Sequence, residues 1–465
     1  MIRLIFILLA FALALAACDG GDRTAADTAR FEATSVPAKP APPTYATAVE
    51  VVDGDTSKPV RGARVVVSGR RITAVRGRAA LGVPRHRVLV RVSAPGYSGQ
   101  RVRLDFRRHL VQRVKLWRPS LQWPMYGVNA ARTQVQAGIK VRPPFRVVWK
   151  RSLHGLLEFP AVVWEGVAYV SNMYGVVQAI SMEDGRVLWS KREGSLMASS
   201  PAIDPKRRVL VTTSMEPGYA TLRSLDTGRR LWRYDTGRSE PSPVIRGGVA
   251  YLGATNGNVY ALDLDRHRAR WVFHGGVKIT SSAALVGRRL YFGDYAGRIF
   301  ALNARTGKVV WRGSAGSRVY GTVAVSGGRV FAPSVFSGLS ALSARNGRLL
   351  WRLPVGDYLY SSPAVFRGRV YFGTYEWLVY SVSTSSGHVY WRRPAGGAVS
   401  AAVQVVGNAV YASSLRGRTT AWNWRTGRQI WSFPHGKYVP ISGSGRRLLV
   451  HGATTLFAVE HKRHR

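Results

Sequence analysis

Carboxylate and amide side chains that could hold a metal ion occur between positions 158 and 376, in stretches with the composition of loops. Oxygen ligands of this kind bind calcium when several of them converge on one point. Here they stand at differing offsets within the surrounding pattern, which favours solvated loop charges over a metal-binding or catalytic cluster. The residues are Glu158, Asn172, Glu240, Asn256, Asp294, Asp357 and Glu376.

Other patterns of catalysis and metal binding are missing from the sequence. It contains no phosphate-binding glycine loop, no paired zinc motif and no nucleophile elbow. Asp53 and Asp55 flank a glycine, which is more typical of a tight turn than of a calcium site. His461 and His464 lie in a basic tail, where metal binding is not expected. The sequence therefore predicts no catalytic and no metal-binding residues.

The chain holds a single cysteine, Cys18, close to its first residue. An apolar stretch from 4 to 15, too short to span a bilayer comfortably, precedes it. The run Leu15-Ala16-Ala17-Cys18 resembles the lipobox of bacterial lipoproteins, although an ordinary signal peptide with a chance cysteine is the alternative. The resemblance implies a signal peptide at 1–17 and a lipidated Cys18. It also implies an extracytoplasmic position on a bacterial membrane, either the cell membrane or the inner leaflet of an outer membrane.

Two further segments precede the main body of the chain. Residues 18–44 are rich in Ala, Thr and Pro, which predicts a flexible tether. Short alternating runs separated by turn clusters predict a small β-sandwich at 45–117. Within it, Lys58-Pro59-Val60-Arg61-Gly62-Ala63 and Ala94-Pro95-Gly96-Tyr97 resemble the carboxypeptidase regulatory-like domain. That resemblance implies a spacer or adhesion module without catalytic residues.

Tryptophan recurs at nearly constant spacing, every 39 to 43 residues, through the rest of the chain. Each interval holds four short alternating runs separated by glycine-containing turns, which is typical of one blade of a β-propeller. A buried tryptophan removes about 150–250 Å² from water, so we expect the series to be structural, packing between neighbouring blades. The series consists of Trp149, Trp189, Trp232, Trp271, Trp311, Trp351, Trp391 and Trp431.

The two ends of this repeat region complement each other. The last unit, 439–459, contains three predicted strands and no terminal tryptophan, whereas 145–149 reads as a fourth strand without the first three. Pairing the two would close a ring and remove its exposed edges. The predicted fold is all-β: an eight-bladed β-propeller at 121–465, its last blade closed by strand 145–149, preceded by the small β-sandwich.

The repeats, with the entry segment Trp123-Pro124-Met125-Tyr126-Gly127, Asn129 and Arg132-Thr133, resemble bacterial propellers of the pyrroloquinoline quinone repeat type. The family includes quinoprotein dehydrogenases and BamB-like lipoproteins, which are noncatalytic scaffolds of outer-membrane barrel assembly. Its repeats specify the fold far better than the function. The periplasmic dehydrogenases typically carry a vicinal disulfide beside the cofactor, which a chain with one cysteine cannot form. We therefore expect no cofactor, with pyrroloquinoline quinone and calcium as the alternative.

Basic residues outnumber acidic residues by 68 to 24, and the formal net charge is +44. A coding bias toward arginine would explain this excess without any function. The turns that join the first to the second and the third to the fourth strand of a blade share one side of a propeller, however, and these turns are rich in arginine. We expect that side to contact anionic lipid or cell-envelope polymer. Its basic residues are Arg186, Arg207, Arg208, Arg229, Arg230, Arg246, Arg288, Arg289, Arg305, Lys308, Arg329, Arg345, Arg348, Arg367, Arg369, Arg425, Arg428, Arg446 and Arg447.

The connections on the other side of the propeller are rich in aromatic residues. A cluster of exposed aromatic side chains around a central funnel is typical of a surface that binds a protein or peptide partner. Packing of several of these side chains beneath their own loops is the alternative. The residues assigned to the partner-binding face are Tyr174, Tyr295, Tyr320, Tyr358, Tyr360, Trp377 and Tyr438.

The favoured function is a non-catalytic extracytoplasmic lipoprotein, whose BamB-like propeller is a binding scaffold for protein or peptide partners in the cell envelope. Two alternatives stay open: a quinone-dependent dehydrogenase, and a binder of anionic cell-envelope polymer or glycan. We expect a monomer that binds no specific nucleic acid. The identity of the partner does not follow from the sequence.

Overall fold

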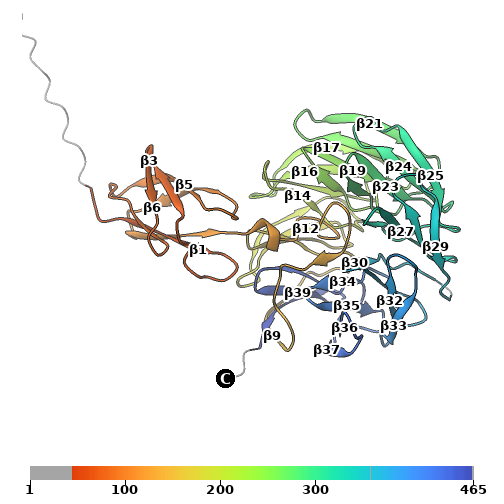
Figure 1. The fold of residues 1–465 in the computed structure, drawn as a ribbon. Helices are drawn as coiled ribbons and strands as arrows, with labels where there is room; N and C mark the ends of the chain where they lie inside the picture. Colours follow the sequence, from red (N-terminus) through yellow and green to blue (C-terminus); the bar gives the residue numbers. More distant parts are fainter. Residues whose placement is uncertain (1–43, 357, 463–465) are drawn as a thin grey trace, which may run out of the picture. The chain divides into compact units, whose positions relative to one another are not determined.

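The computed structural model describes residues 44–356 and 358–462, and these residues are built almost entirely from β-strands (Figure 1). The expected signal peptide, Cys18 and the tether up to residue 43 lie outside the described residues, as do Asp357 and His464. Among the described residues the single helix is the 3-10 turn η1 (Pro119–Leu121). No helix in this part of the chain is long and apolar enough to cross a membrane.

Residues 48–116 form two sheets that share one apolar core. The alternation in the sequence sets which face is buried: in the strand over Arg87–Ser93, Val88, Val90 and Val92 are buried and the intervening side chains are exposed. The first sheet has the order β4-β1-β7 and the second β3-β2-β5-β6. Their strands are β1 (Ala48–Asp53), β2 (Arg64–Val67), β3 (Arg70–Thr73), β4 (Arg78–Ala80), β5 (Arg87–Ser93), β6 (Gln100–Asp105) and β7 (Val111–Leu116).

Asp53 and Asp55 lie at the end of β1 and form a turn. The Asp53 carboxylate accepts the N–H groups of Asp55 and Thr56, both at 2.9 Å, and the Tyr97 hydroxyl at 2.7 Å. Burial, and then the charge of Asp53, raise the pKa of Asp55 to about 6. Both oxygen atoms of the Asp53 carboxylate therefore accept hydrogen bonds from within the protein.

The repeat region forms eight sheets in the described residues, and seven of them contain four strands that follow one another in sequence as antiparallel neighbours (Figure 1). One of these seven gains a fifth strand, β8 (Val135–Gln136). The first four of the seven are β10 (Val162–Trp164), β11 (Val167–Ser171), β12 (Val176–Ser181), β13 (Val187–Arg192); β14 (Ala202–Asp204), β15 (Val209–Thr213), β16 (Tyr219–Ser224), β17 (Arg230–Asp235); β18 (Val244–Arg246), β19 (Val249–Gly253), β20 (Asn258–Asp263), β21 (Arg268–His274); and β22 (Ala284–Val286), β23 (Arg289–Gly293), β24 (Arg298–Asn303), β25 (Val309–Ser314).

The other three of the seven follow the same plan, and the eighth takes its fourth strand from the start of the repeat region. The three are β26 (Ala324–Ser326), β27 (Arg329–Ser334), β28 (Gly338–Ser343), β29 (Leu349–Leu353); β30 (Ala364–Phe366), β31 (Arg369–Gly373), β32 (Leu378–Ser383), β33 (Val389–Pro394); and β34 (Gln404–Val406), β35 (Ala409–Ser414), β36 (Arg418–Asn423), β37 (Gln429–Phe433). The eighth consists of β38 (Ile441–Ser444), β39 (Arg447–His451), β40 (Thr455–His461) and β9 (Phe145–Ser152).

Strand β9 pairs antiparallel with β40, with Trp149 opposite Ala458. The first strand of the first sheet, β10, packs beside β38 of the last sheet. The two ends of the repeat region are therefore neighbours, and the edge of β40 is covered as the sequence predicts.

The tryptophan series lies between neighbouring sheets. The indole N–H of Trp311 donates to the Ala344 carbonyl of the next sheet at 3.1 Å, and its ring covers Gly347. A Cβ at Gly347, whose φ is +77°, would stand 2.5 Å from the ring, so glycine is needed there for both space and conformation. Trp232 instead stacks on His267, with ring centroids 5.4 Å apart. The same indole-to-carbonyl bond is made by Trp149, Trp189, Trp271, Trp351 and Trp391.

A belt of hydroxyl groups also links neighbouring sheets, at the start of their first strands. The N–H of one belt residue donates to the hydroxyl of its counterpart in the next sheet, at 2.9–3.3 Å. Each link satisfies a buried backbone donor, which would otherwise cost free energy. The belt runs through Ser200, Ser242, Ser282, Thr322 and Ser362.

The entry segment, residues 121–139, lies across the first strands of the sheets. Six of its carbonyl groups accept N–H donors from the first strands of six different sheets. Because the first strand of each blade lines the central channel of a propeller, this segment lies across that channel. The pairs, donor first, are Val163 with Trp123, Ile203 with Pro124, Leu285 with Ala130, Val325 with Ala131, Val365 with Thr133 and Val405 with Gln134.

Arg132 anchors the entry segment and is fully buried. Its guanidinium donates to the carbonyl groups of Ser242, Pro243 and Ala283, each at 2.9 Å, and to that of Tyr126. Burial lowers the pKa of Arg132 to about 9, so the group stays protonated at neutral pH. A buried arginine is thus held by backbone oxygens of two sheets and of its own segment.

Candidate functional site

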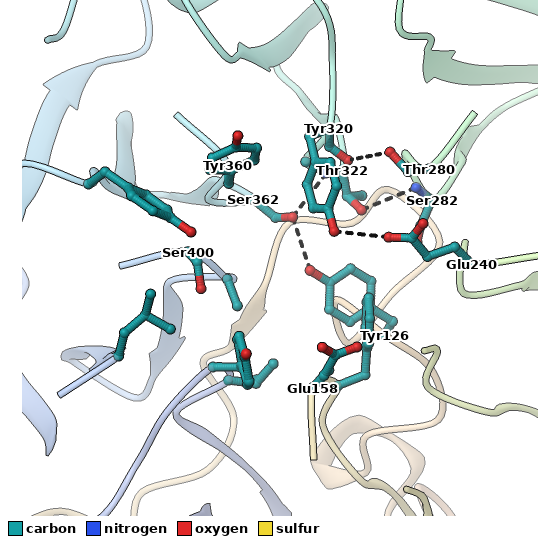
Figure 2. Close-up of a pocket in the computed structure, with 17 residues that line it drawn as sticks. Tyr126, Glu158, Glu240, Thr280, Ser282, Tyr320, Thr322, Tyr360, Ser362 and Ser400 are labelled. Atoms are coloured by element: carbon teal, nitrogen blue, oxygen red, sulfur yellow. Dashed lines mark hydrogen bonds between the residues drawn. The ribbon is translucent and has the colours of Figure 1, made fainter. Parts of the chain in front are cut away.

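The connections between sheets converge on a cavity of about 400 Å³, which we call the central pocket (Figure 2). It is lined by hydroxyl groups, aromatic rings and two carboxylates. Most lining residues come from the connection that leads from one sheet to the next. The lining consists of Tyr126, Glu158, Phe159, Glu240, Thr280, Ser282, Tyr320, Gly321, Thr322, Tyr360, Ser362, Tyr375, Ser400, Ala401, Leu415, Tyr438 and Val439.

The entry segment supplies one wall of the central pocket through Tyr126. The Tyr126 hydroxyl donates to Ser362 Oγ at 3.0 Å, and its ring meets Phe159 edge-on at 5.5 Å between centroids (Figure 2). The guanidinium carbon of Arg132 lies 5.6 Å from the centroid of the same ring. The hydroxyl belt and the buried arginine therefore hold the ring in place.

Two half-buried carboxylates, Glu158 and Glu240, line the central pocket. Glu240 accepts the Tyr320 hydroxyl at 3.0 Å, whereas the Glu158 carboxylate has no hydrogen bond among the described residues (Figure 2). Burial, and then the charge of Glu240, raise the pKa of Glu158. Burial also raises the pKa of Glu240, against the hydrogen bond from Tyr320. The pocket thus holds negative charge at a cost in free energy.

The nearest cations moderate this charge without pairing with it. Lys437 lowers the pKa of Glu158 and Lys278 lowers that of Glu240, in each case less than burial raises it. Within residues 44–356 and 358–462, neither carboxylate has a cationic nitrogen within the 4.0 Å of an ion pair. The Lys278 ammonium instead lies 4.8 Å from the centroid of the Tyr295 ring. Both carboxylates therefore lack a direct counter-ion.

The interpretation of the scattered carboxylates as solvated loop charges is wrong for several of them. Glu158 and Glu240 share the central pocket, because the fold brings their two connections together. Asp294 is buried and pairs with Arg298 at 2.6 Å. Asn172 is buried and donates to the Leu153 carbonyl at 2.8 Å. Asn256 and Glu376 are exposed, as expected.

Five of the seven aromatic residues assigned to the partner-binding face gather at the central pocket. Tyr320, Tyr360 and Tyr438 line it. Tyr295 packs against Tyr320, with centroids 6.3 Å apart, and Tyr358 stacks on Tyr360 at 5.8 Å. The other two do not line it: Tyr174 is 61% exposed, and Trp377 is 44% exposed beneath the guanidinium of Arg416, 4.2 Å away.

Sequence reasoning does not find two of the pocket residues, Tyr126 and Tyr375. Tyr126 belongs to the entry segment, and its contact with Ser362 joins residues 236 positions apart. Tyr375 lies between β31 and β32, and its ring packs against Tyr360 at 5.1 Å. The aromatic content of that connection, which also holds Trp377, is the signal that could have found Tyr375.

Many arginines of the expected basic side are bound within the protein. Arg207 pairs with Asp265 at 2.6 Å, Arg208 with Asp226 at 2.6 Å, and Arg447 with Glu460 at 2.5 Å. Others donate to carbonyl groups of a neighbouring sheet, as Arg246 does to Gly287 at 2.7 Å. Only part of the arginines on this side are therefore free to contact an anionic surface. Several arginine side chains there, including those of Arg288, Arg305 and Arg345, are exposed and make no hydrogen bond or ion pair with the described residues.

Known proteins resemble this chain in sequence and in fold. The outer membrane protein assembly factor BamB of Shewanella oneidensis is 28% identical over 109 residues, which are 22% of this chain and 27% of that protein. The match thus spans about a quarter of that relative. The crystal structure of BamB from Moraxella catarrhalis is similar with a TM-score of 0.57 and 18% identity, over 68% of this chain and 99% of that one.

A quinohemoprotein alcohol dehydrogenase from Comamonas testosteroni is similar with a TM-score of 0.62 and 14% identity, over 74% of this chain and 81% of that one. At such identities the solved structures share the fold alone. The family model described as outer membrane protein assembly factor BamB matches residues 146–274, 268–357 and 335–463, well over half of the chain. These stretches run from β9 to the end of β40. The chain belongs to the family of outer membrane protein assembly factor BamB.

Proposed function

We propose that this chain is a non-catalytic lipoprotein of the bacterial cell envelope, whose propeller binds a protein or peptide partner at the central pocket. Membership of the assembly-factor family supports an envelope propeller without catalytic activity at a coarse level. The proposal adds lipidation at Cys18, which would tie the propeller to a membrane through the tether. It also adds a monomeric state and a carboxypeptidase regulatory-like module at 45–117.

The proposed architecture is a closed ring of eight blades, one for each sheet of the repeat region. Three features support the ring: β9 completes the last sheet, β10 packs beside β38, and the entry segment bonds to six sheets. A closed ring leaves no sheet edge for uncontrolled association. Its connections then present one shared surface around the central pocket.

The observation that carries the proposed function is an aromatic network that runs from the central pocket to exposed surface. The rings of Tyr320 and Tyr360 meet edge-on at 5.0 Å, and Tyr358 joins Tyr360 to Phe336, which is 56% exposed. Tyr358 is itself 38% exposed. Contiguous exposed aromatic side chains beside a pocket are typical of sites that bind protein partners.

The dehydrogenase alternative is disfavoured by the chemistry of the pocket lining. Pyrroloquinoline quinone carries three carboxylates, which need cationic or hydrogen-bonding partners. The described lining offers two glutamates and neither lysine nor arginine. An anionic cofactor would therefore face repulsion where a fit requires attraction. The residues present do not fit this group.

A second binding function, contact with an anionic surface, is favoured by the exposed arginines that make no internal pair. Arg288, Arg305 and Arg345 lie on turns at the ends of the strands away from the central pocket. Such groups attract lipid headgroups or acidic envelope polymer in a manner that weakens with salt. This side would orient the pocket away from the surface that holds the protein.

The test of the proposed function is capture of a partner at the aromatic network. We expect a photo-crosslinking residue at position 358 to trap a protein partner in the native envelope, and one at position 390, exposed on an outer strand, to trap much less. The variant Tyr358→Ala/Tyr360→Ala/Trp377→Ala should lower partner recovery while its melting temperature stays close to wild type. Equal capture at both positions, or unchanged recovery by the triple variant, would contradict the proposal.

A further inference from the structure

The central pocket has the chemistry of a site for a positively charged group. We propose that it binds an ammonium or guanidinium group carried by a lysine or arginine side chain of the partner. The inference rests on the proposed binding function and adds the chemical identity of the group that enters the pocket. It is carried by the two carboxylates and the aromatic walls, with a further hydroxyl of the lining beside them.

The carboxylates supply the first reason. Glu158 and Glu240 lie half-buried in one cavity, repel each other, and have no cationic partner within ion-pair distance in the described part of the chain. The chain has 68 basic residues, so a lack of cations does not explain why these two acids stay unpaired. An incoming cation would relieve their repulsion and gain charge-assisted hydrogen bonds.

The aromatic walls supply the second reason. The rings of Tyr126, Tyr320, Tyr360, Tyr375 and Tyr438 all line the pocket, and Tyr320 is oriented by its hydrogen bond to Glu240. The face of such a ring attracts a cation within about 6 Å of its centroid, more strongly when water is excluded. Carboxylates and ring faces together favour an organic cation over a neutral or anionic group.

A further hydroxyl in the same lining can serve the same ligand. Ser400 is a partly buried residue whose Oγ is shielded from solvent beside the Tyr375 hydroxyl. A shielded hydroxyl gains free energy when a ligand donor bonds to it. An ammonium or guanidinium group brings several N–H donors, which can serve Ser400 and the carboxylates together.

A divalent metal ion fits the pocket less well than an organic cation. Calcium takes six to eight oxygen ligands, and the lining holds only two carboxylates, Glu158 and Glu240. In residues 44–356 and 358–462, no group of three or more His, Cys, Asp or Glu side chains is placed to hold a metal ion.

The charge around the mouth suggests how the group is presented. Lys278 and Lys437 lie near the carboxylates, while the guanidinium groups of Arg318 and Arg416 lie over Phe336 and Trp377 at 5.1 Å and 4.2 Å. A free polyamine would bring further positive charges close to Lys278 and Lys437. A single lysine or arginine side chain flanked by neutral or acidic residues places one cation inside and avoids the repulsion.

The experiment titrates the purified full chain with two positively charged probes and one neutral probe, followed by calorimetry. The probes are agmatine, N-acetyl-arginine amide and the uncharged N-acetyl-norleucine amide. We expect the two cations to bind and the neutral analogue not to bind. Binding of the arginine amide should weaken at least about tenfold in Glu158→Gln/Glu240→Gln, since charge-assisted hydrogen bonds are lost. The matched control Glu376→Gln removes an exposed carboxylate outside the pocket and should bind as wild type does.

Two further measurements extend the experiment. One distinguishes a partner side chain from a free amine, and the other follows the pH dependence of binding. A pentapeptide with one central arginine that binds more tightly than agmatine supports a partner side chain, whereas tighter binding of agmatine overturns that assignment in favour of a free amine. Because burial raises the pKa of both glutamates, binding should weaken as the pH falls from neutral toward their pKa values.

Several results would overturn the inference. They are equal binding of the neutral analogue, equal binding by the double variant, calcium binding that requires both glutamates, and no detectable binding of either cation. Partner capture at position 358 that persists in Glu158→Gln/Glu240→Gln would refute the cation site while leaving the proposed scaffold function intact. If the chain with both glutamates intact captures no partner at position 358, the scaffold function itself is refuted.

Discussion

The two ends of the strands in the repeat region use charge in opposite ways. Away from the central pocket, Arg207, Arg208 and Arg447 are held by carboxylates at 2.5–2.6 Å. In the pocket, Glu158 and Glu240 have no such partner among the described residues. With 68 basic and 24 acidic residues, acids are scarce, and most structural pairs use them to hold arginine. Two acids without a cationic partner in one cavity are what the proposed cation site requires.

The residues around Tyr126 extend this comparison of paired and unpaired charges. Arg132 is a buried cation that donates to four backbone carbonyl groups, and its guanidinium carbon lies 5.6 Å from the centroid of the Tyr126 ring. In the central pocket, by contrast, Glu240 has only the Tyr320 hydroxyl as a partner and Glu158 has none among the described residues. The buried cation is thus held within the protein, whereas the proposed site leaves the two carboxylates without a cation. The following changes test that division, from the largest expected effect to the smallest.

Removal of the buried cation should have the largest effect. Arg132→Ala leaves four carbonyl oxygens without their donor and a cavity beneath Tyr126. We expect the free energy of unfolding to fall by at least about 3 kcal/mol, measured by denaturant titration. Arg288→Ala, which removes an exposed arginine without a side-chain partner, should change it by less than about 0.5 kcal/mol. Similar values for the two variants would contradict a structural role for the entry segment.

Truncation of the tryptophan series should have a comparable, slightly smaller effect. Trp311→Ala removes a buried indole from between two sheets, together with its bond to Ala344. We expect a loss of about 3–4 kcal/mol, because the site cannot collapse around Gly347. Trp377→Ala, at a 44% exposed indole, should cost less than about 1 kcal/mol. A mild Trp311→Ala variant would show that the series does not hold the sheets together.

Loss of a saturated arginine at the other ends of the strands should have an intermediate effect. Arg447 joins the last sheet to the first, since it pairs with Glu460 and donates to the carbonyl of Glu183 at 2.6 Å. Arg447→Ala should lower the free energy of unfolding by about 1.5–3 kcal/mol. Its neighbour Arg446, 51% exposed and 3.6 Å from Glu460, is the matched control and should contribute little. Equal losses of stability in the two variants would mean that burial does not decide how much an arginine contributes here.

The pocket carboxylates should show the smallest effect, and with the opposite sign. Their pKa values are raised in the folded chain, so they lower stability as the pH rises through those values. Glu158→Gln/Glu240→Gln should therefore raise the melting temperature at neutral pH, by on the order of 1 °C. Below about pH 4 the difference from wild type should vanish. A stability loss in the double variant would mean that these groups hold the fold together.

The elements of the fold follow from local patterns, whereas the site does not. The tryptophan spacing and the glycine turns indicate repeated four-stranded units, because alternation and turn chemistry act within about ten residues. The covering of β40 by β9 also follows, since one unit lacks a strand that another segment offers. In contrast, Glu158 and Glu240 read as unrelated loop charges when only their offsets are considered.

The sequence by itself determined the all-β class, the period of the repeats and the side on which aromatic residues gather. Only the tertiary structure decided that Tyr126 meets Ser362, that Arg132 is enclosed by two sheets, and that the two glutamates share a cavity. The physical reason is the packing of the sheets around the entry segment, which brings together residues that are separated by many units and that no local pattern relates. Burial then changes what these residues do. Water solvates a carboxylate on the surface, whereas a carboxylate in a pocket costs free energy unless a cation or a hydrogen-bond donor reaches it.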